Sequence, residues 1–502
     1  MSLLHDTDLD LIARYAHEPA PLLAILHAFQ DRDGWLEPEV LQKISKRLRI
    51  PLAELSGTLS FYEHFRTSAS APEKHRASEY ATDELQLGLA PLPPVNPGGH
   101  EECVFAHLRA PARKTLTGYR TSGGFEALAH TLRTRSPKDL RELVTASGLA
   151  GRGGAGFPTG KKWNFVAEAP GSVRYVIANA DEGEPFCAKD RPLLDHDPFA
   201  LLEGMALAAY GAEATVGIIY LRYEYPDTVP ILEQAIAACE AHGFLGERIL
   251  GSPFGFRIHL RRAAGSYLCG EETALLESLE GRRPFPRNRP PYPAQKGLYA
   301  QPTLIQNIET LCAVPPIVRR GPEWYQKLGL PGFAGTKIIS VFGDVQRPGN
   351  YEVPFGLPMR TLLEEWAGGA LAGRRLVAAT MAGLSGGLLA AREFDVAIAE
   401  PALRQHGCML GAGGVLVLDD SRDLLAMARE TARFFAHESC GKCFPCRIGT
   451  QRLVERFSQL DHSAAWRSEI EDLIATMAQT SACGLGQAAA TIPKSLLDKF
   501  LK

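Results

Sequence analysis

The sequence has no excess of either charge. Its 54 Lys and Arg residues and 57 Asp and Glu residues give a net charge of −3 over 502 residues. Nucleic-acid binding without sequence preference requires a basic surface that neutralises phosphates, so this balance disfavours a nucleic-acid partner. The hydrophobic fraction of 45% and the charged fraction of 22% are ordinary for folded proteins and exclude bulk disorder.

Export and membrane signals are also missing. Residues 1–18 mix Asp6, Asp8 and Asp10 with scattered apolar residues, where a signal peptide would have a basic region followed by an apolar one. The longest uncharged stretch of the glycine-rich middle, residues 376–391, is interrupted by glycines and is shorter than the roughly 20 residues of a spanning helix. We therefore expect a cytoplasmic protein with no membrane span.

The cysteine pattern does not fit a disulfide framework, because ten unevenly placed cysteines in a cytoplasmic chain favour metal or redox chemistry. Cys440, Cys443 and Cys446 recur at every third position, and Cys483 follows later. Four cysteines without histidine suit zinc or an iron–sulfur cluster, and the three-plus-one spacing favours a [4Fe–4S] cluster. Zinc and four unrelated structural cysteines stay open as alternatives. We expect no metal at the other six, Cys103, Cys187, Cys239, Cys269, Cys312 and Cys408.

A glycine-rich segment is the second candidate for chemistry. It reads Gly151-Arg-Gly-Gly-Ala-Gly-Phe-Pro-Thr-Gly-Lys-Lys-Trp163, and its glycines allow backbone N–H groups to approach a phosphate closely. Lys161 or Lys162 could add a positive charge. The segment is not a Walker motif, which disfavours nucleotide hydrolysis, and its match to Gly-x-Gly-x-x-Gly is weak evidence alone. A glycine loop without a ligand is the alternative.

Two acidic motifs follow predicted strands. Asn179-Ala-Asp-Glu-Gly-Glu-Pro185 comes directly after the β-rich run 174–178, and Gly265-Ser-Tyr-Leu-Cys-Gly-Glu-Glu-Thr273 opens a helix. The carboxyl ends of parallel strands are where α/β folds bind ligands. A solvated acidic loop is the alternative for the first motif. For Glu271 and Glu272 the alternative is a pair of first-turn acids favoured by the helix dipole.

The chain as a whole is predicted to be an α/β multidomain protein. Apolar stripes at helical spacing mark a small N-terminal unit, β-rich runs alternating with helical segments indicate a parallel sheet, and a mixed region precedes a helical C-terminus. The expected boundaries are an N-terminal helical unit at 1–67, a linker at 68–113, an α/β domain at 114–335, a mixed α+β unit at 336–419 and a helical domain at 420–502.

These motifs, in this order, resemble those of the NADH-binding flavoprotein subunit of respiratory complex I. Diaphorase subunits of NAD-dependent hydrogenases and formate dehydrogenases share them. The resemblance runs from about residue 136 to the C-terminus and includes Asn307-Ile-Glu-Thr310. It implies FMN, one [4Fe–4S] cluster and NAD(H) as substrate. It also implies a Rossmann-like FMN-binding domain at 114–335, a β-grasp domain of the SLBB type at 336–419 and a cluster-bearing helical bundle at 420–502.

The resemblance also assigns residues to roles. Glu184 and Phe157 would position NADH, with Phe165 beside them, and the four motif cysteines would hold the cluster. Two positions depart from the family pattern: Arg289-Pro-Pro-Tyr292 stands for the usual Lys-Pro-Pro-Phe, and Gln306-Asn307 for the usual Asn-Asn. The cofactor-binding residues expected are Gly151, Arg152, Gly153, Lys162, Phe165, Asn179, Asp181, Glu182, Tyr267, Gly270, Glu271, Glu272, Arg289, Tyr292, Gln306, Asn307 and Thr310.

The N-terminal unit resembles a different protein. Gly34-Trp-Leu-x-Pro38 and Ser60-Phe-Tyr-x-x-Phe65 are similar to the helical start of the thioredoxin-like [2Fe–2S] subunit that pairs with such flavoproteins. Cys103 is the sole cysteine between Tyr62 and Arg135, so no second cluster is expected there. Because three short helices cannot bury these stripes among themselves, we expect residues 1–67 to dock onto a partner subunit. The alternative is an inert fusion remnant that packs on its own chain.

This fusion is similar to the β (diaphorase) subunit of soluble, molybdenum-containing NAD-dependent formate dehydrogenases. It implies two partners, a thioredoxin-like [2Fe–2S] subunit and a molybdenum-containing catalytic subunit that oxidises formate to CO2. The diaphorase of an NAD-reducing hydrogenase and the NADH-oxidising subunit of complex I are the enzyme alternatives. A non-catalytic scaffold subunit is the alternative of another class.

Overall fold

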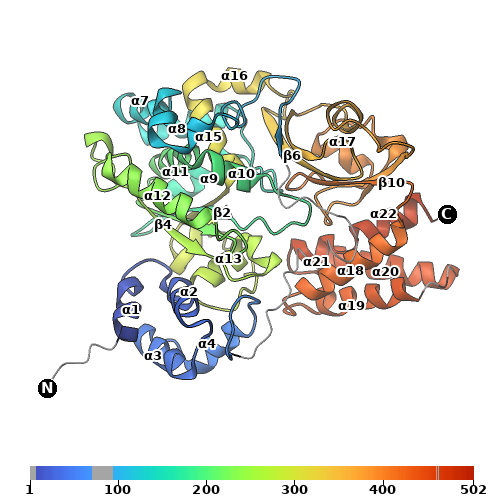
Figure 1. Cartoon of the computed structure of the whole chain (residues 1–502), viewed down its shortest axis with the longest axis horizontal. Helices are drawn as coiled ribbons and strands as arrows, with labels where there is room; N and C mark the ends of the chain where they lie inside the picture. The colour runs from blue at the N-terminus through green and yellow to red at the C-terminus, as the bar shows by residue number, and fades with distance from the viewer. Residues whose placement is uncertain (1–6, 70–93, 460, 462, 502) are drawn as a thin grey trace.

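The chain folds into four packed parts, which Figure 1 shows in the order of the sequence. The computed structural model describes residues 7–69, 94–459, 461 and 463–501. The parts are a helical N-terminal unit, a first α/β domain, a second sheet domain and a C-terminal helical bundle. Within the described ranges, none of the helices has the length and apolar character needed to cross a membrane.

The first α/β domain is built on a fully parallel four-stranded sheet, as predicted, in the order β4-β3-β2-β5. From β2 the chain moves outward to β3 and β4, and then returns to place β5 on the opposite side of β2. The strand order therefore reverses between β2 and β5, where parallel sheets open a crevice at their carboxyl ends. The strands are β2 (Tyr175–Ala180), β3 (Val216–Leu221), β4 (Arg257–Arg262) and β5 (Thr303–Asn307).

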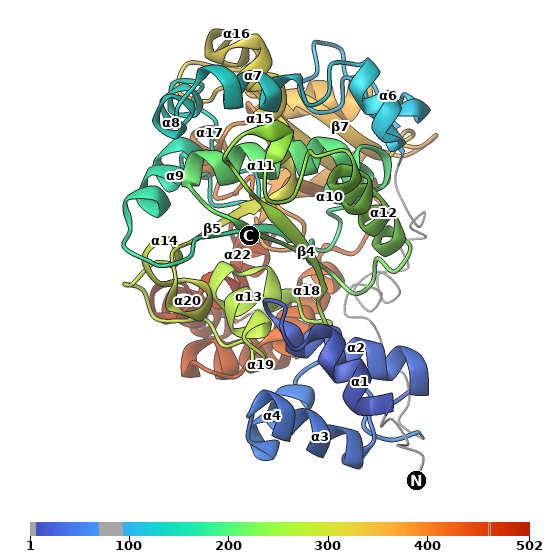
Figure 2. The same ribbon diagram turned by 90° about the vertical axis from the view of Figure 1, so that its left-hand side faces the viewer.

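Both faces of this sheet are covered, as a parallel sheet requires. Side chains such as Val176 and Ala178 pack on one face against α11 and α15, and the alternate residue Ile177 packs on the other face against α13 and the N-terminal unit. Figure 2 shows the sheet edge-on between these layers. The helices are α6 (Leu116–Thr121), α7 (Glu126–Thr134), α8 (Pro137–Ala146), α9 (Thr159–Glu168), α10 (Asp190–His196), α11 (Pro198–Ala212), α12 (Thr228–Ala241), α13 (Glu272–Leu279), α14 (Pro293–Lys296), α15 (Ile308–Arg320) and α16 (Pro322–Lys327).

The N-terminal unit packs on its own chain, and this corrects the expectation that its apolar stripes need a partner subunit. Phe29, Tyr62 and Phe65 are buried in a cluster that includes Ile218 of β3, and the Tyr62 hydroxyl donates to Ser278 Oγ of α13 at 2.8 Å. Helical periodicity identified an apolar face but not the surface that covers it. Helix α4 ends at Leu59, so the motif from Ser60 to Phe65 lies beyond the helix. The helices are α1 (Thr7–Tyr15), α2 (Pro21–Asp33), α3 (Pro38–Leu48) and α4 (Leu52–Leu59).

The second sheet domain has a mixed six-stranded sheet in the order β1-β7-β6-β10-β8-β9. The described end of the predicted linker, 94–113, supplies β1 and is anchored by Glu352 of β7, whose carboxylate accepts N–H bonds from Cys103 at 2.8 Å and Phe105 at 2.6 Å. Residues 70–93 of that linker lie outside the described part. The elements are β1 (Val95–Asn96), β6 (Thr336–Gly343), β7 (Gly349–Pro354), β8 (Leu376–Thr380), β9 (Leu388–Ala390), α17 (Glu400–Gln405), β10 (Gly414–Asp419) and a π-helical turn at Thr361–Trp366.

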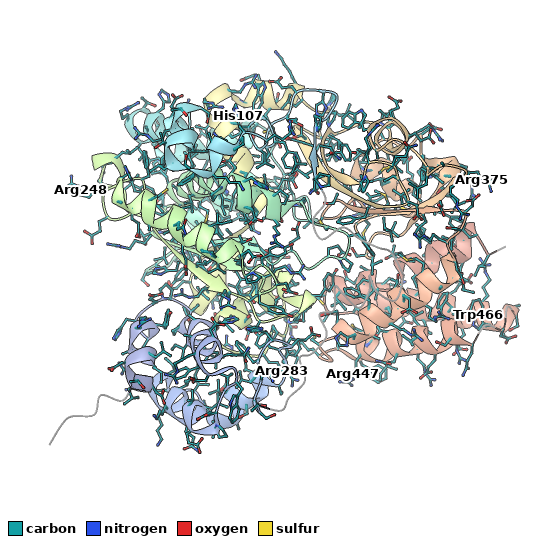
Figure 3. The ribbon with its side chains drawn as sticks, in the orientation of Figure 1. His107, Arg248, Arg283, Arg375, Arg447 and Trp466 are labelled. Carbon is teal, nitrogen blue, oxygen red and sulfur yellow. The ribbon has the colours of Figure 1, made fainter. Side chains whose placement is uncertain are left out.

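The C-terminal bundle begins after β10 and is helical, as predicted. Asp423 caps its first helix by accepting the N–H groups of Leu425 and Ala426, and Phe457 packs edge-on against Trp466, which Figure 3 labels. Helix α22 returns to contact β9 of the second sheet domain. The helices are α18 (Leu424–Glu438), α19 (Phe444–Ser458), α20 (Ala464–Thr480), α21 (Gly484–Ala488) and α22 (Thr491–Lys499).

Candidate functional site

The crevice at the carboxyl ends of β2 and β5 brings several predicted site residues together. Asn179 and Asn307 are register partners on the two adjacent strands, one residue beyond the partners Ala178 and Gln306. The glycine loop lies against the same edge, since a Cβ atom on Gly153 would come within 3.1 Å of Asn307 Cβ. Any larger residue at 153 would fill the space between the loop and the strand end.

The glycine loop leads into the N-terminus of α9, where Thr159 N donates to the Leu149 carbonyl at 2.8 Å. Gly151 N donates to Phe157 O at 2.9 Å, which closes the loop just before α9, and Pro158 provides no side-chain cap for that helix. The first N–H groups of an uncapped helix are a ready anion site. Thr159 Oγ1 is buried there without a hydrogen-bond partner among the described residues. The residues present therefore suit a phosphate group.

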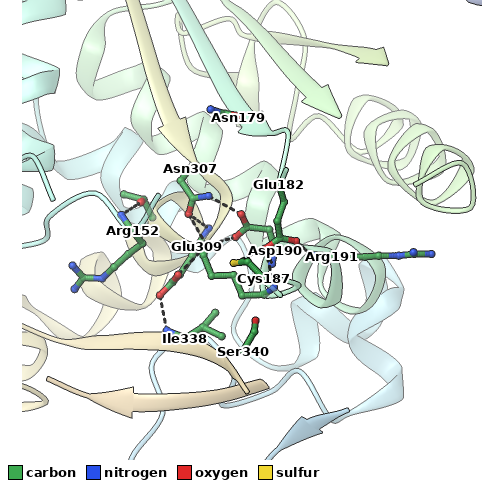
Figure 4. A network of polar contacts seen from close by, with 12 residues as sticks. Arg152, Asn179, Glu182, Cys187, Asp190, Arg191, Asn307, Glu309, Ile338 and Ser340 are labelled. Atoms are coloured by element: carbon green, nitrogen blue, oxygen red, sulfur yellow. Dashed lines mark hydrogen bonds and ion pairs between the residues drawn. The ribbon is translucent and has the colours of Figure 1, made fainter. Parts of the chain in front are cut away.

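The Arg152 side chain points away from this opening. Its guanidinium donates to the carbonyls of Thr336 at 2.9 Å and Ala334 at 2.8 Å and to the Tyr325 hydroxyl at 2.7 Å. Its backbone N–H donates to Thr310 Oγ1 at 2.8 Å. The predicted cofactor residues Arg152 and Thr310 thus join the glycine loop to α15 and to the second sheet domain (Figure 4).

A chain of ion pairs links α9 to the loop after α13. Lys162 Nζ lies 3.0 Å from Glu272 Oε2 and 2.8 Å from the Ile305 carbonyl, and Arg289 Nη1 lies 3.0 Å from Glu272 Oε1. Burial acts to raise the pKa of Glu272, but the two cations outweigh it and hold the pKa below its usual value. Three predicted residues, Lys162, Glu272 and Arg289, are therefore in mutual contact through one carboxylate.

Three aromatic side chains near α9 are exposed, which is unusual for such large apolar groups. Phe157 is 42% exposed, Phe165 is 44% exposed and Tyr292 is 54% exposed. The rings of Phe157 and Phe165 have centroids 6.3 Å apart, and Tyr292 precedes α14, which packs against α9. Exposed rings on one rim provide flat apolar surfaces on which a base or a nicotinamide ring can stack.

Glu184 connects the first α/β domain with the second sheet domain. Its carboxylate accepts hydrogen bonds from the Tyr267 hydroxyl at 2.6 Å, from Leu384 N at 2.8 Å and from Ser385 Oγ at 3.1 Å. Burial raises the pKa of Glu184 to about 7, although these three donors favour the ionised form. Glu184 and Tyr267, both predicted as site residues, are thus held in direct contact.

Two of the predicted acids cap helices. Glu182 accepts the N–H groups of Lys189 at 2.8 Å and Asp190 at 2.9 Å, which begin α10. Glu271 accepts the N–H groups of Thr273 and Ala274, both at 2.9 Å, at the start of α13. The Glu271 carboxylate thus occupies the capping position that the helix-dipole alternative implies. Burial, the largest effect, raises the pKa of Glu182 to about 7.

The remaining crevice residues lie on the loops that close it. Asn179 Nδ2 donates to the Gly270 carbonyl at 2.9 Å, and Asn179 Oδ1 accepts from Asp181 N at 3.2 Å. Asp181 carries a buried Oδ2 with no hydrogen-bond partner among the described residues, and burial raises its pKa well above the usual value. Gln306 is buried within β5.

Sequence reasoning missed a buried network of charges beneath the crevice (Figure 4). Lys189 Nζ lies 2.6 Å from Asp190 Oδ1 and 3.0 Å from Glu309 Oε2, and Lys337 Nζ of β6 lies 2.6 Å from the same Glu309 oxygen. Asn307 joins it by donating to Asp190 Oδ2 at 2.6 Å. In the sequence these residues look like ordinary surface charges. Only Glu309 lies in a motif that the sequence analysis singled out, Asn307–Thr310.

The network ties the crevice to the second sheet domain electrostatically. Burial lowers the pKa of Lys337 to about 8, although Glu309 works against this shift. Burial acts to raise the pKa of Glu309, but Lys337 and Lys189 hold it below the usual value. Removing one member would leave an unpaired charge in a site closed to water.

The four motif cysteines line one cavity in the C-terminal bundle, together with apolar groups such as Leu268 and Leu485. Cys443 and Cys483 occupy the N-cap positions of α19 and α21. The remaining cysteines among the described residues are buried elsewhere. Figure 3 labels Arg447, which follows the triad and fixes its loop by donating to the Gly441 carbonyl at 2.8 Å.

The chemistry of this donor set fits a metal cluster. Burial, the largest effect, raises the pKa of Cys446 to about 12, so a thiolate there requires a compensating cation. Iron–sulfur clusters are held by four cysteine thiolates, frequently with hydrogen bonds to their sulfurs. The Ser439 hydroxyl lies 3.3 Å from Cys446 Sγ. The cavity therefore offers four sulfur ligands and little else, as a [4Fe–4S] cluster needs.

Family models match the same parts of the chain that the structure separates. The Nuo51 FMN-binding domain matches residues 144–316, the SLBB domain 338–387 and the NADH-ubiquinone oxidoreductase-F iron–sulfur binding region 426–502. The thioredoxin-like [2Fe–2S] ferredoxin family matches residues 9–77. The expected fold and the expected FMN and [4Fe–4S] cofactors are thereby confirmed.

Individual relatives agree with these families. An NADH-quinone oxidoreductase subunit of Rhizobium meliloti (strain 1021) is 43% identical over 80% of this chain and 96% of its own. NADP-reducing hydrogenase subunit HndC of Solidesulfovibrio fructosivorans is 38% identical over 77% of this chain and 79% of its own. Among solved structures, a chain of the NAD+-reducing [NiFe]-hydrogenase in the H2-reduced state superposes with a TM-score of 0.80 and 30% identity, covering 96% of this chain and 91% of its own. The chain therefore belongs to the Nuo51 family of NADH-quinone oxidoreductase subunits, with its FMN-binding domain and its [4Fe–4S] region.

Proposed function

We propose that this chain is the diaphorase subunit of a cytoplasmic NAD-dependent formate dehydrogenase. In this assembly a molybdenum-containing partner subunit oxidises formate to CO2, and the present chain reduces NAD+. The observation that carries the proposal is the combination, on one chain, of polar residues gathered at the ends of β2 and β5 beside exposed aromatic side chains, a four-cysteine cavity and a fused N-terminal unit. The module is an NAD(H):acceptor oxidoreductase.

The chemistry requires a converter between two kinds of electron transfer. NAD(H) exchanges two electrons as a hydride and an iron–sulfur cluster exchanges one, and FMN supplies both modes when bound. The chain's own residues bind NAD(H) and orient it. The Glu184 carboxylate is placed to accept hydrogen bonds from the ribose or the carboxamide of NAD(H), and the exposed ring of Phe157 is placed to stack on it.

The cofactor residues divide by how they act. The glycine loop that begins at Gly151 and includes Gly153 would hold the FMN phosphate, together with the N-terminus of α9, through the backbone N–H groups that have no partner within the loop. Arg152 and Thr310 would act on the cofactor by fixing the backbone of the glycine loop, and Glu182 and Glu271 by fixing the starts of α10 and α13. The other residues proposed to contact FMN or NAD(H) directly are Lys162, Phe165, Asn179, Asp181, Tyr267, Gly270, Glu272, Arg289, Tyr292, Gln306 and Asn307.

The diaphorase of an NAD-reducing hydrogenase is the second candidate, and one observation favours it. The solved hydrogenase chain covers 96% of this chain, whereas the Rhizobium meliloti relative covers 80%. The wider coverage takes in the N-terminal unit, so the fusion is compatible with both enzymes. In either assembly we propose a thioredoxin-like [2Fe–2S] subunit as the neighbouring partner.

Metal analysis of the native complex separates these candidates. We expect the complex purified with this chain to contain molybdenum and to reduce NAD+ with formate. Nickel together with hydrogen-dependent NAD+ reduction would replace the formate assignment with a hydrogenase. A purified chain without a flavin absorption spectrum and without NADH-to-dye activity would contradict both and identify a scaffold subunit.

A further inference from the structure

A small acidic cavity lies where the N-terminal unit, the first α/β domain and the C-terminal bundle meet, and Asp181 and Tyr267 of the proposed cofactor site are among its lining residues. Figures 1 and 2 show the three parts converging below the parallel sheet. Glu63 comes from the segment after α4, Asp181 from the loop after β2, and Glu438 from the last residue of α18. Arg222 and Glu224, which follow β3, line it as well.

Three side chains at this junction could bind one ion. One carboxylate oxygen each of Glu63 and Glu438 and one ring nitrogen of His437 all lie within 4.8 Å of one another. His437 Nε2 already lies 2.7 Å from Glu63 Oε1. The side chain of His437 is 59% exposed, so it is free to turn outward by the small amount that an ion between the two atoms requires.

An unpartnered buried oxygen supplies the independent evidence for a ligand. Glu438 is only 5% exposed, and its Oε2 accepts the Tyr267 N–H at 2.9 Å. Its Oε1 is buried and has no hydrogen-bond partner among the described residues, and the same holds for Asp181 Oδ2 in the same cavity. Buried polar atoms are almost always paired, because an unpaired one has given up its hydrogen bonds to water without replacing them.

The charges of the cavity are also unbalanced. Four carboxylates line it, from Glu63, Asp181, Glu224 and Glu438, against the single guanidinium of Arg222. That guanidinium is engaged with Glu224 Oε1 at 2.7 Å and also with the backbone carbonyl of Glu182. A divalent cation would supply the missing positive charge at the point where the unpartnered oxygens lie.

We propose that Glu63, His437 and Glu438 form a divalent transition-metal site. Imidazole combined with carboxylates suits Zn²⁺ and related first-row ions, whereas Mg²⁺ and Ca²⁺ prefer oxygen ligands alone. The ion ties the N-terminal unit to the end of α18, two residues before the first cluster cysteine, Cys440. Its role is to fasten the N-terminal unit over the first domain and the cluster loop.

Zinc titration of the full-length protein tests this site. The protein is purified without air with its iron and flavin in place and freed of added divalent metal, and Zn²⁺ is titrated by calorimetry with the iron content measured before and after. We expect about one Zn²⁺ per chain, and an affinity at least tenfold weaker in Glu63→Gln and in His437→Asn, equivalent to about 1.4 kcal/mol or more. Zn²⁺ should raise the unfolding temperature of the wild type and not of the variants.

His242→Asn is the matched control, because His242 is an exposed histidine directly after α12 whose Nδ1 lies 2.9 Å from the Ala238 carbonyl of that helix. This variant should bind zinc like the wild type. NADH-to-dye activity in each variant reports that the fold is intact. The proposal is overturned by absence of saturable binding, by wild-type affinity in both site variants, or by zinc uptake that occurs only with loss of iron.

Discussion

The cysteine cavity and the crevice at the strand ends use polar groups in opposite ways. In the cavity, four thiols face one space lined by apolar groups such as Leu268 and Leu485. In the crevice, nearly every predicted polar side chain is already hydrogen-bonded to another protein group, as with Glu271 and Arg152. Thiols are weak hydrogen-bonding groups, so four of them gather only for a metal or for disulfides. Carboxylates and guanidinium groups bind other protein groups as readily as they bind ligands.

The strongest test of this contrast removes one thiol. Cys443→Ala should abolish the cluster, with the loss of close to four irons per chain, because three remaining thiolates leave the cage open. FMN should stay bound, because no predicted flavin residue belongs to the bundle. Iron analysis and flavin absorbance of protein purified without air measure both.

Cys239→Ala provides the control, since it removes a buried thiol on α12, far from the cavity in sequence. It should keep its iron. Zinc in place of iron in the wild-type protein would show that the cavity holds a different metal.

A second test breaks the charge network under the crevice. Glu309→Leu leaves Lys189 and Lys337 facing each other without the carboxylate they share. Unpairing a buried charge costs about 3–5 kcal/mol, so the free energy of unfolding, measured in denaturant, should fall by that amount. Asp395→Asn breaks an exposed pair with Arg360, which water and salt screen, so it should change the free energy of unfolding far less. Equal effects of the two variants would show that the network is not structural.

The same contrast explains what could be predicted from the sequence. The β3 strand at 216–221 and the cysteine ligand set follow from local patterns, namely β-branched runs and thiol spacing. The network of Lys189, Glu309 and Lys337 could not be found this way, because a charged residue looks the same in sequence whether it is solvated or paired. Likewise the aromatic residues of the motif from Ser60 to Phe65 indicated an apolar surface, but only the folded structure shows that they are buried in a cluster that includes Ile218 of the sheet.

The third test asks whether the Glu184 carboxylate serves the ligand. Glu184→Gln should raise the KM for NADH about tenfold, the loss of about 1.4 kcal/mol of binding, while FMN stays bound. Because burial sets the pKa of Glu184 near 7, the wild-type KM should fall as the pH rises from 6 to 8 and the carboxylate ionises. The variant should show a flat profile in NADH-to-dye kinetics.

Ser385→Ala refines this test. The Ser385 hydroxyl donates to Glu184 Oε2 at 3.1 Å and favours the ionised form, so its removal should shift the midpoint of the KM profile to higher pH. Rising pH should have the opposite effect on the stability of the protein. The pKa of Glu184 is higher in the folded than in the unfolded protein, so Glu184 contributes stability that is fully present below about pH 4.5 and is lost as the pH rises through 7. A pH-independent KM in the wild type would remove Glu184 from the NADH site.

The smallest expected effect tests whether a predicted cofactor residue is in fact a cap. Glu271 accepts the N–H groups of Thr273 and Ala274 at the start of α13, and loss of such a cap costs about 0.5–2 kcal/mol. Glu271→Ala should therefore lower the unfolding temperature slightly. Glu271→Asp shortens the side chain but keeps a strong capping residue, so it should recover most of the loss. If Glu271→Ala instead releases FMN at an unchanged unfolding temperature, the carboxylate binds the cofactor directly. The polar groups of the crevice would then serve a ligand, as the thiols of the cysteine cavity do, and not mainly the structure of the protein.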